Sequence, residues 1–545
     1  MLMMKGKVSA AETGHLLPQT TNQPLQQIKN HWFCRYLCLP SKAATQVILW
    51  TAVVGTMYYF ALSLVMIIIY TNPLTSASIS VFVSLLYATL AIAMMLYPLS
   101  GFMADVCCGR LKVVIISMSL LLACALTVCF VEILVFIFKL EIIPYNNYGE
   151  FLHRNITQFL FGLSLVCAVV LMVGLAGFQA NYVQLGLDQL FEARIRYLRL
   201  FIHYSVWVFH LGLLPLRIID SFVSCSYPGK IAMQPKIALL LTPFIVSFLL
   251  VVLLIVYRWK CHWFLSEPGR ENPYLNVFKV IKFAKQHKYP LRRSAFTYSD
   301  DVIPSRIDLS KERYGGPFTT EQVENVKTFF RILLILFAMG PIFTLEVPSS
   351  YFVFPLFGLH ALHYHKHIGK DFCDTTEHKW ESGFVETGSL MTLLSLTCLF
   401  PIYTCIVNFS PLCKKMSNIF HRIQLGAAFS FLGVISLLVI DVVGHSLNGT
   451  IGLNNTQCMF QLYRTNTTIS YPALNLHWAI LIPPNLFLGI GSLIVIATTY
   501  EFISAHFPQS MKGLLIGVYF AIRGLFHFLN SIVILGFSFK NPWAS

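Results

Sequence analysis

Apolar residues in this chain occur in blocks of roughly 20, the length that an α-helix needs to cross the hydrocarbon core of a bilayer. The sequence contains eleven such blocks, at 46–70, 78–100, 112–139, 157–185, 199–219, 236–257, 328–347, 384–406, 423–443, 476–499 and 514–538. Only 12% of the 545 residues are charged. Inside lipid the backbone must satisfy its own hydrogen bonds, so the blocks predict helices rather than strands. The sequence therefore predicts an all-α polytopic membrane protein.

The formal net charge of +15 does not indicate nucleic-acid binding, because Lys and Arg gather beside the ends of the blocks on one predicted side. The positive-inside rule places the N-terminus and the basic segment 258–313 in the cytoplasm. Four N-glycosylation acceptors occur where this rule predicts external loops. They are Asn155, Asn448, Asn454 and Asn466.

The blocks divide into six, a long polar segment and five, which is the layout of the major facilitator architecture. We expect an N-terminal cytoplasmic tail (1–45), an N-terminal six-helix bundle (46–257), a cytoplasmic linker (258–327) and a C-terminal bundle (328–545). The count is one helix short, so the twelfth helix of that architecture is apparently missing. Within the linker, the Gly315-Gly316-Pro317 breaker and Thr320 predict the start of a helix that runs into the seventh block.

The stretch "YPLSGFMADVCCGRLKVV" places a compact charged turn after the second block. We expect Pro98 and Gly101 to end that block and Gly109 to permit a tight turn. Asp105 can pair with Arg110 or with bases of neighbouring loops. Such a cluster can latch two bundles in one state and release them in another. The alternative is that these charges only fix the topology.

This turn resembles the loop between helices two and three of the proton-dependent oligopeptide transporter family, a branch of the major facilitators. Further resemblances follow in the family's order: "AGFQANYVQLGLDQLF" (176–191), "FIHYSVWVFHLG" (201–212), "VENVKTFFRI" (323–332) and "YEFISAHFPQSMKG" (500–513). The resemblance implies a symporter that works by alternating access. Such a protein would import di- and tripeptides, or related solutes, on a proton gradient.

The sequence departs from that family where the proton-coupling charges are expected. Thr51, Val54 and Gly55 stand in the places of the two acids and the arginine of the first helix. Gln179 replaces the fourth-helix lysine, and Ser492 replaces the tenth-helix glutamate. Because an unpaired charge in a membrane is costly, acids and bases are expected to disappear together. Whether proton coupling survives is left open.

The resemblance and the residue types together give a candidate substrate site. Its members are Tyr58, Tyr59, Gln179, Asn181, Glu346 and Ser492, with Asp105 and Arg110 as gating residues. Glu346 is either a functional acid of the seventh span or a solvated residue near its outer rim. We expect Glu501 at a solvated interface, and Arg523 and His527 facing other helices or water.

Two short patterns carry weaker hypotheses. The segment 360–378 holds five histidines, but their spacing matches no closed zinc site, so no metal is predicted. Near the N-terminus, "ETGHLLP" fits an acidic dileucine signal for sorting adaptors, formed by Glu12, Leu16 and Leu17, although such patterns also recur by chance. The membrane is therefore expected to be the plasma membrane or that of endosomes or lysosomes.

The sequence is consistent with two functions. The first is a secondary active transporter that moves small peptides or peptide-like solutes, with protons as possible co-substrate. The alternative is a transport-deficient, transporter-like membrane protein that acts in ligand sensing or partner binding. An enzyme is not predicted, because the spans show no nucleophile–base pair and no metal motif, and the chain has no phosphate loop; no cofactor is expected either.

Overall fold

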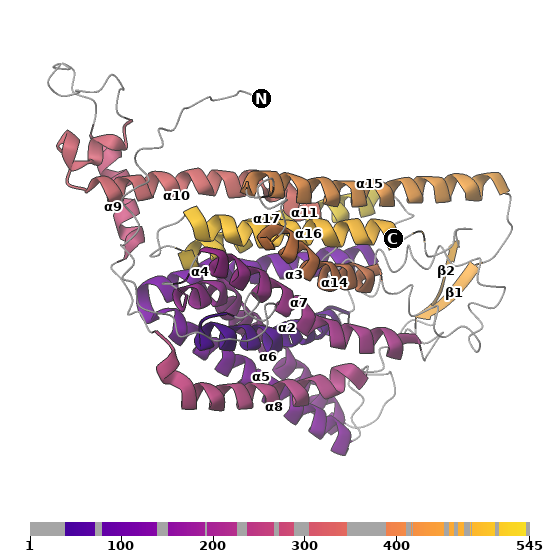
Figure 1. Ribbon diagram of the computed structural model, residues 1–545. Helices are drawn as coiled ribbons and strands as arrows, with labels where there is room; N and C mark the ends of the chain where they lie inside the picture. Colours follow the sequence, from indigo (N-terminus) through magenta and orange to yellow (C-terminus); the bar gives the residue numbers. More distant parts are fainter. Residues whose placement is uncertain are drawn as a thin grey trace. The chain divides into compact units, whose positions relative to one another are not determined.

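The architecture comes from a computed structural model (Figure 1). The structure describes, apart from a few single positions, residues 39–70, 79–138, 151–190, 195–225, 237–265, 272–287, 305–345, 388–409, 418–451, 457–462, 467–472, 482–506 and 512–540.

Helices cover all six blocks of the first half. They are α2 (Lys42–Tyr70), α3 (Ile79–Met94), α4 (Leu96–Phe102), α5 (Arg110–Phe138), α6 (Phe151–Asp188), α7 (Ile195–Cys225) and α8 (Ile237–Lys260). The second half follows with α10 (Thr320–Ala338), α11 (Gly340–Leu345), α14 (Gly388–Phe409), α15 (Ile419–Ile451), α16 (Ile482–His506) and α17 (Lys512–Lys540). Each of the eleven predicted blocks thus contains a helix.

Within the described residues, nine helical stretches are long and apolar enough to cross a membrane. The predicted polytopic helical fold class is confirmed. One addition is a short antiparallel hairpin between α15 and α16, in which β1 (Gln457–Leu462) pairs with β2 (Thr467–Pro472). The apolar blocks of the sequence predict helices alone, so this hairpin is not among the predicted elements.

The expectation that Pro98 and Gly101 end the second span is wrong. Pro98 lies in the first turn of α4, where a missing backbone N–H costs no helical hydrogen bond. The helix continues through Gly101 into a π-helical turn, η2 (Met103–Cys108). The chain reverses only at Gly109, whose φ of 82° is a conformation that glycine adopts without strain.

Gly101 serves helix packing instead of termination. A Cβ atom at this position would lie 2.2 Å from the carbonyl oxygen of Gly513 on α17. The backbones of α4 and α17 therefore touch, as small residues allow in membrane proteins. Helix α17 also packs along α3, while α7 packs against α14 and α16, so helices of the first half meet helices of the second along these contacts.

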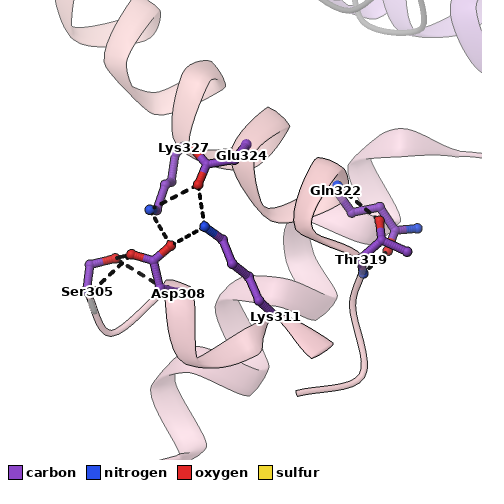
Figure 2. Close-up of polar contacts among 7 residues, drawn as sticks. All are labelled: Ser305, Asp308, Lys311, Thr319, Gln322, Glu324 and Lys327. Atoms are coloured by element: carbon purple, nitrogen blue, oxygen red, sulfur yellow. Dashed lines mark hydrogen bonds and ion pairs between the residues drawn. The ribbon is translucent and has the colours of Figure 1, made fainter. Parts of the chain in front are cut away.

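The segment between the halves is folded. It contains η3 (Cys261–Trp263), α9 (Pro273–Gln286), η4 (Asp308–Ser310) and η5 (Glu312–Tyr314). Helix α10 begins at Thr320, as expected. Thr319 caps it through a capping box with Gln322 (Figure 2). Gly315, which precedes this helix, has a φ of 83°.

Four charged residues fix this segment onto α10: Asp308, Lys311, Glu324 and Lys327 (Figure 2). Both lysines contact Asp308, whose second oxygen accepts from the Ser305 hydroxyl at 2.6 Å. Partial burial alone would raise the pKa of Asp308, but the two ammonium groups and the hydroxyl hold that pKa well below its usual range. The carboxylate is thus the centre of the segment's polar network.

Candidate functional site

Arg110, the first residue of α5, joins two carboxylates. Its Nη1 donates to both oxygens of Asp188, the last residue of α6, at 2.9 and 2.7 Å. Its Nε and Nη2 donate to Oδ1 of Asp105 at 3.2 and 3.0 Å. The Asp105 side chain is fully buried, so its charge depends on these donors. The sequence allowed Asp105 to pair either with Arg110 or with bases of neighbouring loops. In the structure it pairs with Arg110.

The second oxygen of Asp105 reaches beyond the first half. It accepts from the backbone N–H of Leu514, in the first turn of α17, at 3.0 Å, which is a favourable place for an anion. It also accepts from the Tyr274 hydroxyl of α9 at 3.1 Å. Burial and the neighbouring Asp105 carboxylate raise the pKa of Tyr274 above its ordinary value, so the phenol stays a donor.

Glu501, near the end of α16, is the centre of a second cluster, and the expectation that it is solvated at an interface is wrong. It is only 6% exposed. Arg422 of α15 donates to both its oxygens at 2.7 Å, a bidentate geometry. Arg199 of α7 lies 3.2 Å from the carboxylate. With His203, three side chains from two other helices, α7 and α15, therefore hold this acid.

His203 of α7, in the first half, contacts residues of the second half within this cluster. Its Nε2 lies 2.7 Å from Oε1 of Glu501, and its Nδ1 lies 3.2 Å from the Thr404 hydroxyl of α14. The imidazole is fully buried and stacks on Tyr403 with ring centroids 5.4 Å apart. Residues of α7 thus bind residues of α14 and α16 through one buried imidazole.

The two clusters have a matching layout. In each, an arginine in the first turns of a helix, Arg110 of α5 or Arg422 of α15, binds an acid near the end of the following helix, Asp188 of α6 or Glu501 of α16. In each, one acid also binds the first turns of a helix from the other half, α17 or α7. Both clusters therefore mark the same end of the helices and connect the halves there.

Tyrosines from both halves gather between these helices. Tyr97 of α4 donates to the amide oxygen of Gln179 on α6. Its ring contacts Phe520 of α17 at 4.3 Å, and Tyr58 of α2 is within electrostatic range. Tyr500 of α16 completes the group from the other half. The predicted residue Gln179 is thus bound by Tyr97, which the sequence did not single out.

Arg523 of α17 lies near the tyrosine group described above. Its charge acts on Tyr58, Tyr97 and His210, which come from α2, α4 and α7. The guanidinium is half-buried and His527 one turn away is buried, so both face protein as expected. A cation therefore lies near these tyrosines.

The remaining predicted site residues have different surroundings. Asn181 is buried and donates to the Ser100 hydroxyl of α4 at 3.2 Å, which fixes α6 against α4. Tyr59 is half-buried on α2, and Ser492 is buried on α16. Glu346 lies outside the described residues.

The three positions that lack the family's charges face protein. Thr51 is buried and donates to the Val47 carbonyl of its own helix at 2.8 Å, and Val54 is fully buried. A Cβ atom at Gly55 would lie 2.3 Å from the carbonyl oxygen of Phe209 on α7. An arginine at position 55 would force α2 and α7 apart, so the loss of these charges is built into the helix packing.

Two of the four predicted glycosylation acceptors, Asn454 and Asn466, lie outside the described residues. Asn155 and Asn448 lie on the backbone of α6 and α15, so the expectation that these two are in loops is wrong. The sorting residues Glu12, Leu16 and Leu17 and the histidine-rich segment 360–378 are also outside. Among the residues that the structure does describe, no group of three or more metal-ligating side chains is present.

No protein-family model matches the chain. Solute carrier family 15 member 3 of mouse is 22% identical over 395 residues, and the rat protein of the same name is 21% identical over 399 residues. Each alignment covers 69% of this chain. The chain spans 62% of the length of these relatives.

The matching solved structures include two with TM-scores above one half. An auto-inhibited peptide transporter of the POT (proton-dependent oligopeptide transporter) family gives a TM-score of 0.58 at 14% identity, over 92% of this chain and 89% of its own. The chain has the fold of the POT family transporters. A second such structure, the POT family transporter PepTSo, gives 0.55 at 15% identity over 92% and 90% of the two chains. The resemblance to this family that the motifs suggested is confirmed, and the chain is a divergent, integral membrane example of the POT fold.

Proposed function

We propose that this protein is a secondary transporter that moves small peptides or peptide-like solutes by alternating access. The observation that carries the proposal is the pair of charge clusters within a POT fold, each of which binds one half of the molecule to the other. Asp105 holds α17 through the Leu514 N–H, and Glu501 holds α7 through His203 and Arg199.

These clusters suit a gate because each contact between the halves can exchange for water. Arg110 keeps Asp105 paired when α17 moves away, and Arg422 keeps Glu501 paired when α7 moves away. Separation therefore leaves no buried acid without a cation, which would otherwise be costly. The gating roles assigned to Asp105 and Arg110 belong to this proposal.

The tyrosine group between the helices is the proposed solute site. Tyr58, Tyr97 and the amide of Gln179 offer hydrogen bonds and aromatic faces to a peptide group. Arg523 supplies the positive charge that a solute carboxylate prefers. Tyr59, Asn181, Ser492 and Glu346 remain proposed members of the site.

Proton coupling is part of the proposal, but at other residues than the family's first helix. The resemblance implies coupling, while Thr51, Val54 and Gly55 carry no charge. The His203–Glu501 contact joins the halves and contains an imidazole, the side chain that serves as a proton shuttle in many proteins. We assign the coupled proton to this pair.

The proposed location is the plasma membrane or an endosomal or lysosomal membrane, with the N-terminus and the linker in the cytoplasm. The basic residues beside the spans support this orientation. The dileucine pattern supports the endosomal route, with sorting adaptors as partners.

The test is uptake by the purified protein in proteoliposomes. A panel of labelled di- and tripeptides is offered with and without an inward proton gradient, to the wild type and to Glu346→Gln. Uptake above that of protein-free vesicles is expected, and stimulation by the gradient supports coupling. No uptake of any member at any pH would overturn the peptide-transport proposal.

The second candidate is a transport-deficient protein that senses a ligand or binds a partner. The observation in its favour is the tight α2–α7 packing at Gly55, which leaves no space for a larger side chain at that position of the family's charged motif. Saturable peptide binding to the purified protein, without uptake in the same proteoliposomes, would favour this candidate.

A further inference from the structure

Helix α9, in the segment between the two halves, is held in place on one side only. Asn272 caps its start, accepting from the N–H groups of Tyr274 and Leu275 at 3.1 and 3.2 Å. Arg306 donates to the carbonyls of Ala284 and Lys285 at its end, at 2.9 and 3.0 Å. On the side of α9 that faces the protein, three side chains are buried, those of Val277, Val280 and Ala284. The helix therefore has a fixed rotation and a defined outer face.

That outer face carries two parallel stripes. The first is apolar, with three exposed side chains spaced three residues apart: Leu275 (48% exposed), Phe278 (64%) and Ile281 (36%). Each is followed one turn later by an exposed lysine, at Lys279, Lys282 and Lys285. Residues four apart lie on the same side of a helix, so the basic stripe runs directly beside the apolar one. Helix α9 contains no acidic residue.

The start of α9 lies against the end of a membrane-spanning helix. The Tyr274 hydroxyl donates to Asp105 at 3.1 Å, and its ring lies 5.4 Å from that of Phe102, the last residue of α4. The apolar stripe begins at the next residue, Leu275. The outer face of α9 therefore starts at the depth where the spanning helices leave the hydrocarbon core.

Tryptophans lie at the end of α8, which precedes α9 in the chain, and in the following turn η3. Trp259 is 74% exposed near its end, and Trp263 lies under the ammonium groups of Lys42 and Lys260 at 5.3 and 5.1 Å. Tryptophan and lysine together are typical of a membrane–water interface. The Gln189 side chain joins this region to the end of α6 through two hydrogen bonds with the Leu265 backbone. Helix α9 is thus attached to the interfacial end of the helices.

We propose that α9 binds the membrane surface at the Asp105 end of the helices. Leu275, Phe278 and Ile281 enter the headgroup region, and the three lysines bind the phosphate groups of anionic lipids. An amphipathic helix with lysines beside an apolar stripe has this chemistry. Anionic lipids are concentrated in the cytoplasmic leaflet, the side on which the basic loops place this segment. The proposal does not depend on transport.

The test uses the full-length protein in lipid nanodiscs. A fluorescent amino acid is introduced in place of Phe278, and quenching by brominated acyl chains is measured in discs with and without phosphatidylserine. Strong quenching that increases with the anionic lipid is expected. In anionic discs, hydrogen exchange of residues 273–286 should be slower than in neutral discs.

Charge variants separate lipid binding from mere proximity. Combined Lys279→Gln, Lys282→Gln and Lys285→Gln should lower the quenching in anionic discs several-fold, whereas Arg313→Gln, an exposed base of the same segment, should not. Absence of quenching in both lipids would overturn the proposal. Equal quenching in both lipids with no effect of the lysines would also overturn it, as would a photo-crosslinker at position 278 that captures a second copy of the chain instead of lipid.

Discussion

The two terminal nitrogens of Arg422 donate hydrogen bonds to the two carboxylate oxygens of Glu501, both at 2.7 Å. The arginine is completely buried. A buried guanidinium cannot release its proton, so it needs an anion at this place. Glu501 in turn is shared with His203 and Arg199 from the other half of the molecule. One carboxylate therefore both neutralises a buried cation and connects the halves.

Glu501→Gln should destabilise the protein by about 3–5 kcal/mol, because it leaves Arg422 buried without an anion. The measurement is the thermal unfolding midpoint of the purified protein in detergent. Glu321→Gln, an exposed acid in the first turn of α10, is the control and should change the midpoint little. Equal midpoints for wild type and Glu501→Gln would show that the cluster does not stabilise the fold.

Gly101→Ala should separate α4 from α17, since its Cβ would lie 2.2 Å from the Gly513 carbonyl oxygen. Overpacking of this kind costs about 1–3 kcal/mol. Gly162→Ala is the matched control in α6, where a Cβ meets no atom within 4 Å, and it should be neutral or stabilise by up to about 1 kcal/mol. A Gly101→Ala protein as stable as the Gly162→Ala protein would contradict the close contact of α4 and α17.

The polar network of Asp308 should make the linker sensitive to acid. Because the folded-state pKa of Asp308 lies below the ordinary value of 3.8, its stabilisation is fully present above that pH and is lost as the pH falls through the lower, folded value. Hydrogen exchange of residues 305–327 should therefore accelerate progressively below about pH 4.

Two variants test the origin of this acid response. Asp308→Asn should exchange faster already at neutral pH and lose the acid-dependent step that Asp308 contributes. Glu312→Gln, an exposed acid in η5, should behave as the wild type. If Asp308→Asn keeps the full acid response, other carboxylates are responsible.

Arg523→Gln should lower uptake of solutes that carry a free carboxylate by roughly tenfold, since a hydrogen bond to a charged group contributes about 1.5–3 kcal/mol. Uptake of the same solutes with an amidated C-terminus should change much less. Arg331→Gln, an exposed arginine of α10, is the control. Equal losses for the acid and the amide would indicate a structural role for Arg523.

The spans and the Asp105–Arg110 pair could be predicted because their signals are local. Blocks of apolar residues identify the helices, and Asp105 and Arg110 lie five residues apart. The second cluster could not be found this way, since Glu501 and His203 are 298 residues apart and the acid lies at the end of an apolar block. The useful signal would have been that Arg199, Arg422 and Glu501 all lie near helix ends on one predicted side.

Tyr274 and Tyr97 were missed for a related reason. A tyrosine in a polar linker or an aromatic-rich helix has no distinctive pattern, and only the fold shows that Tyr274 donates to Asp105 and Tyr97 to Gln179. Conversely, the sequence identified the loss of charge at Gly55 but not its cause, the carbonyl of Phe209.

Transport by alternating access requires the two halves to separate at the charge clusters during each cycle. Spin-labelled amino acids at the exposed positions Met103 and His506, which lie in the first and second halves, allow this distance to be measured by double electron–electron resonance in nanodiscs. We predict two populations, with the longer distance enriched by transported solute and in Arg199→Gln, which removes a contact between the halves. A single unchanged distance in the wild type and the variant, with and without solute, would contradict alternating access.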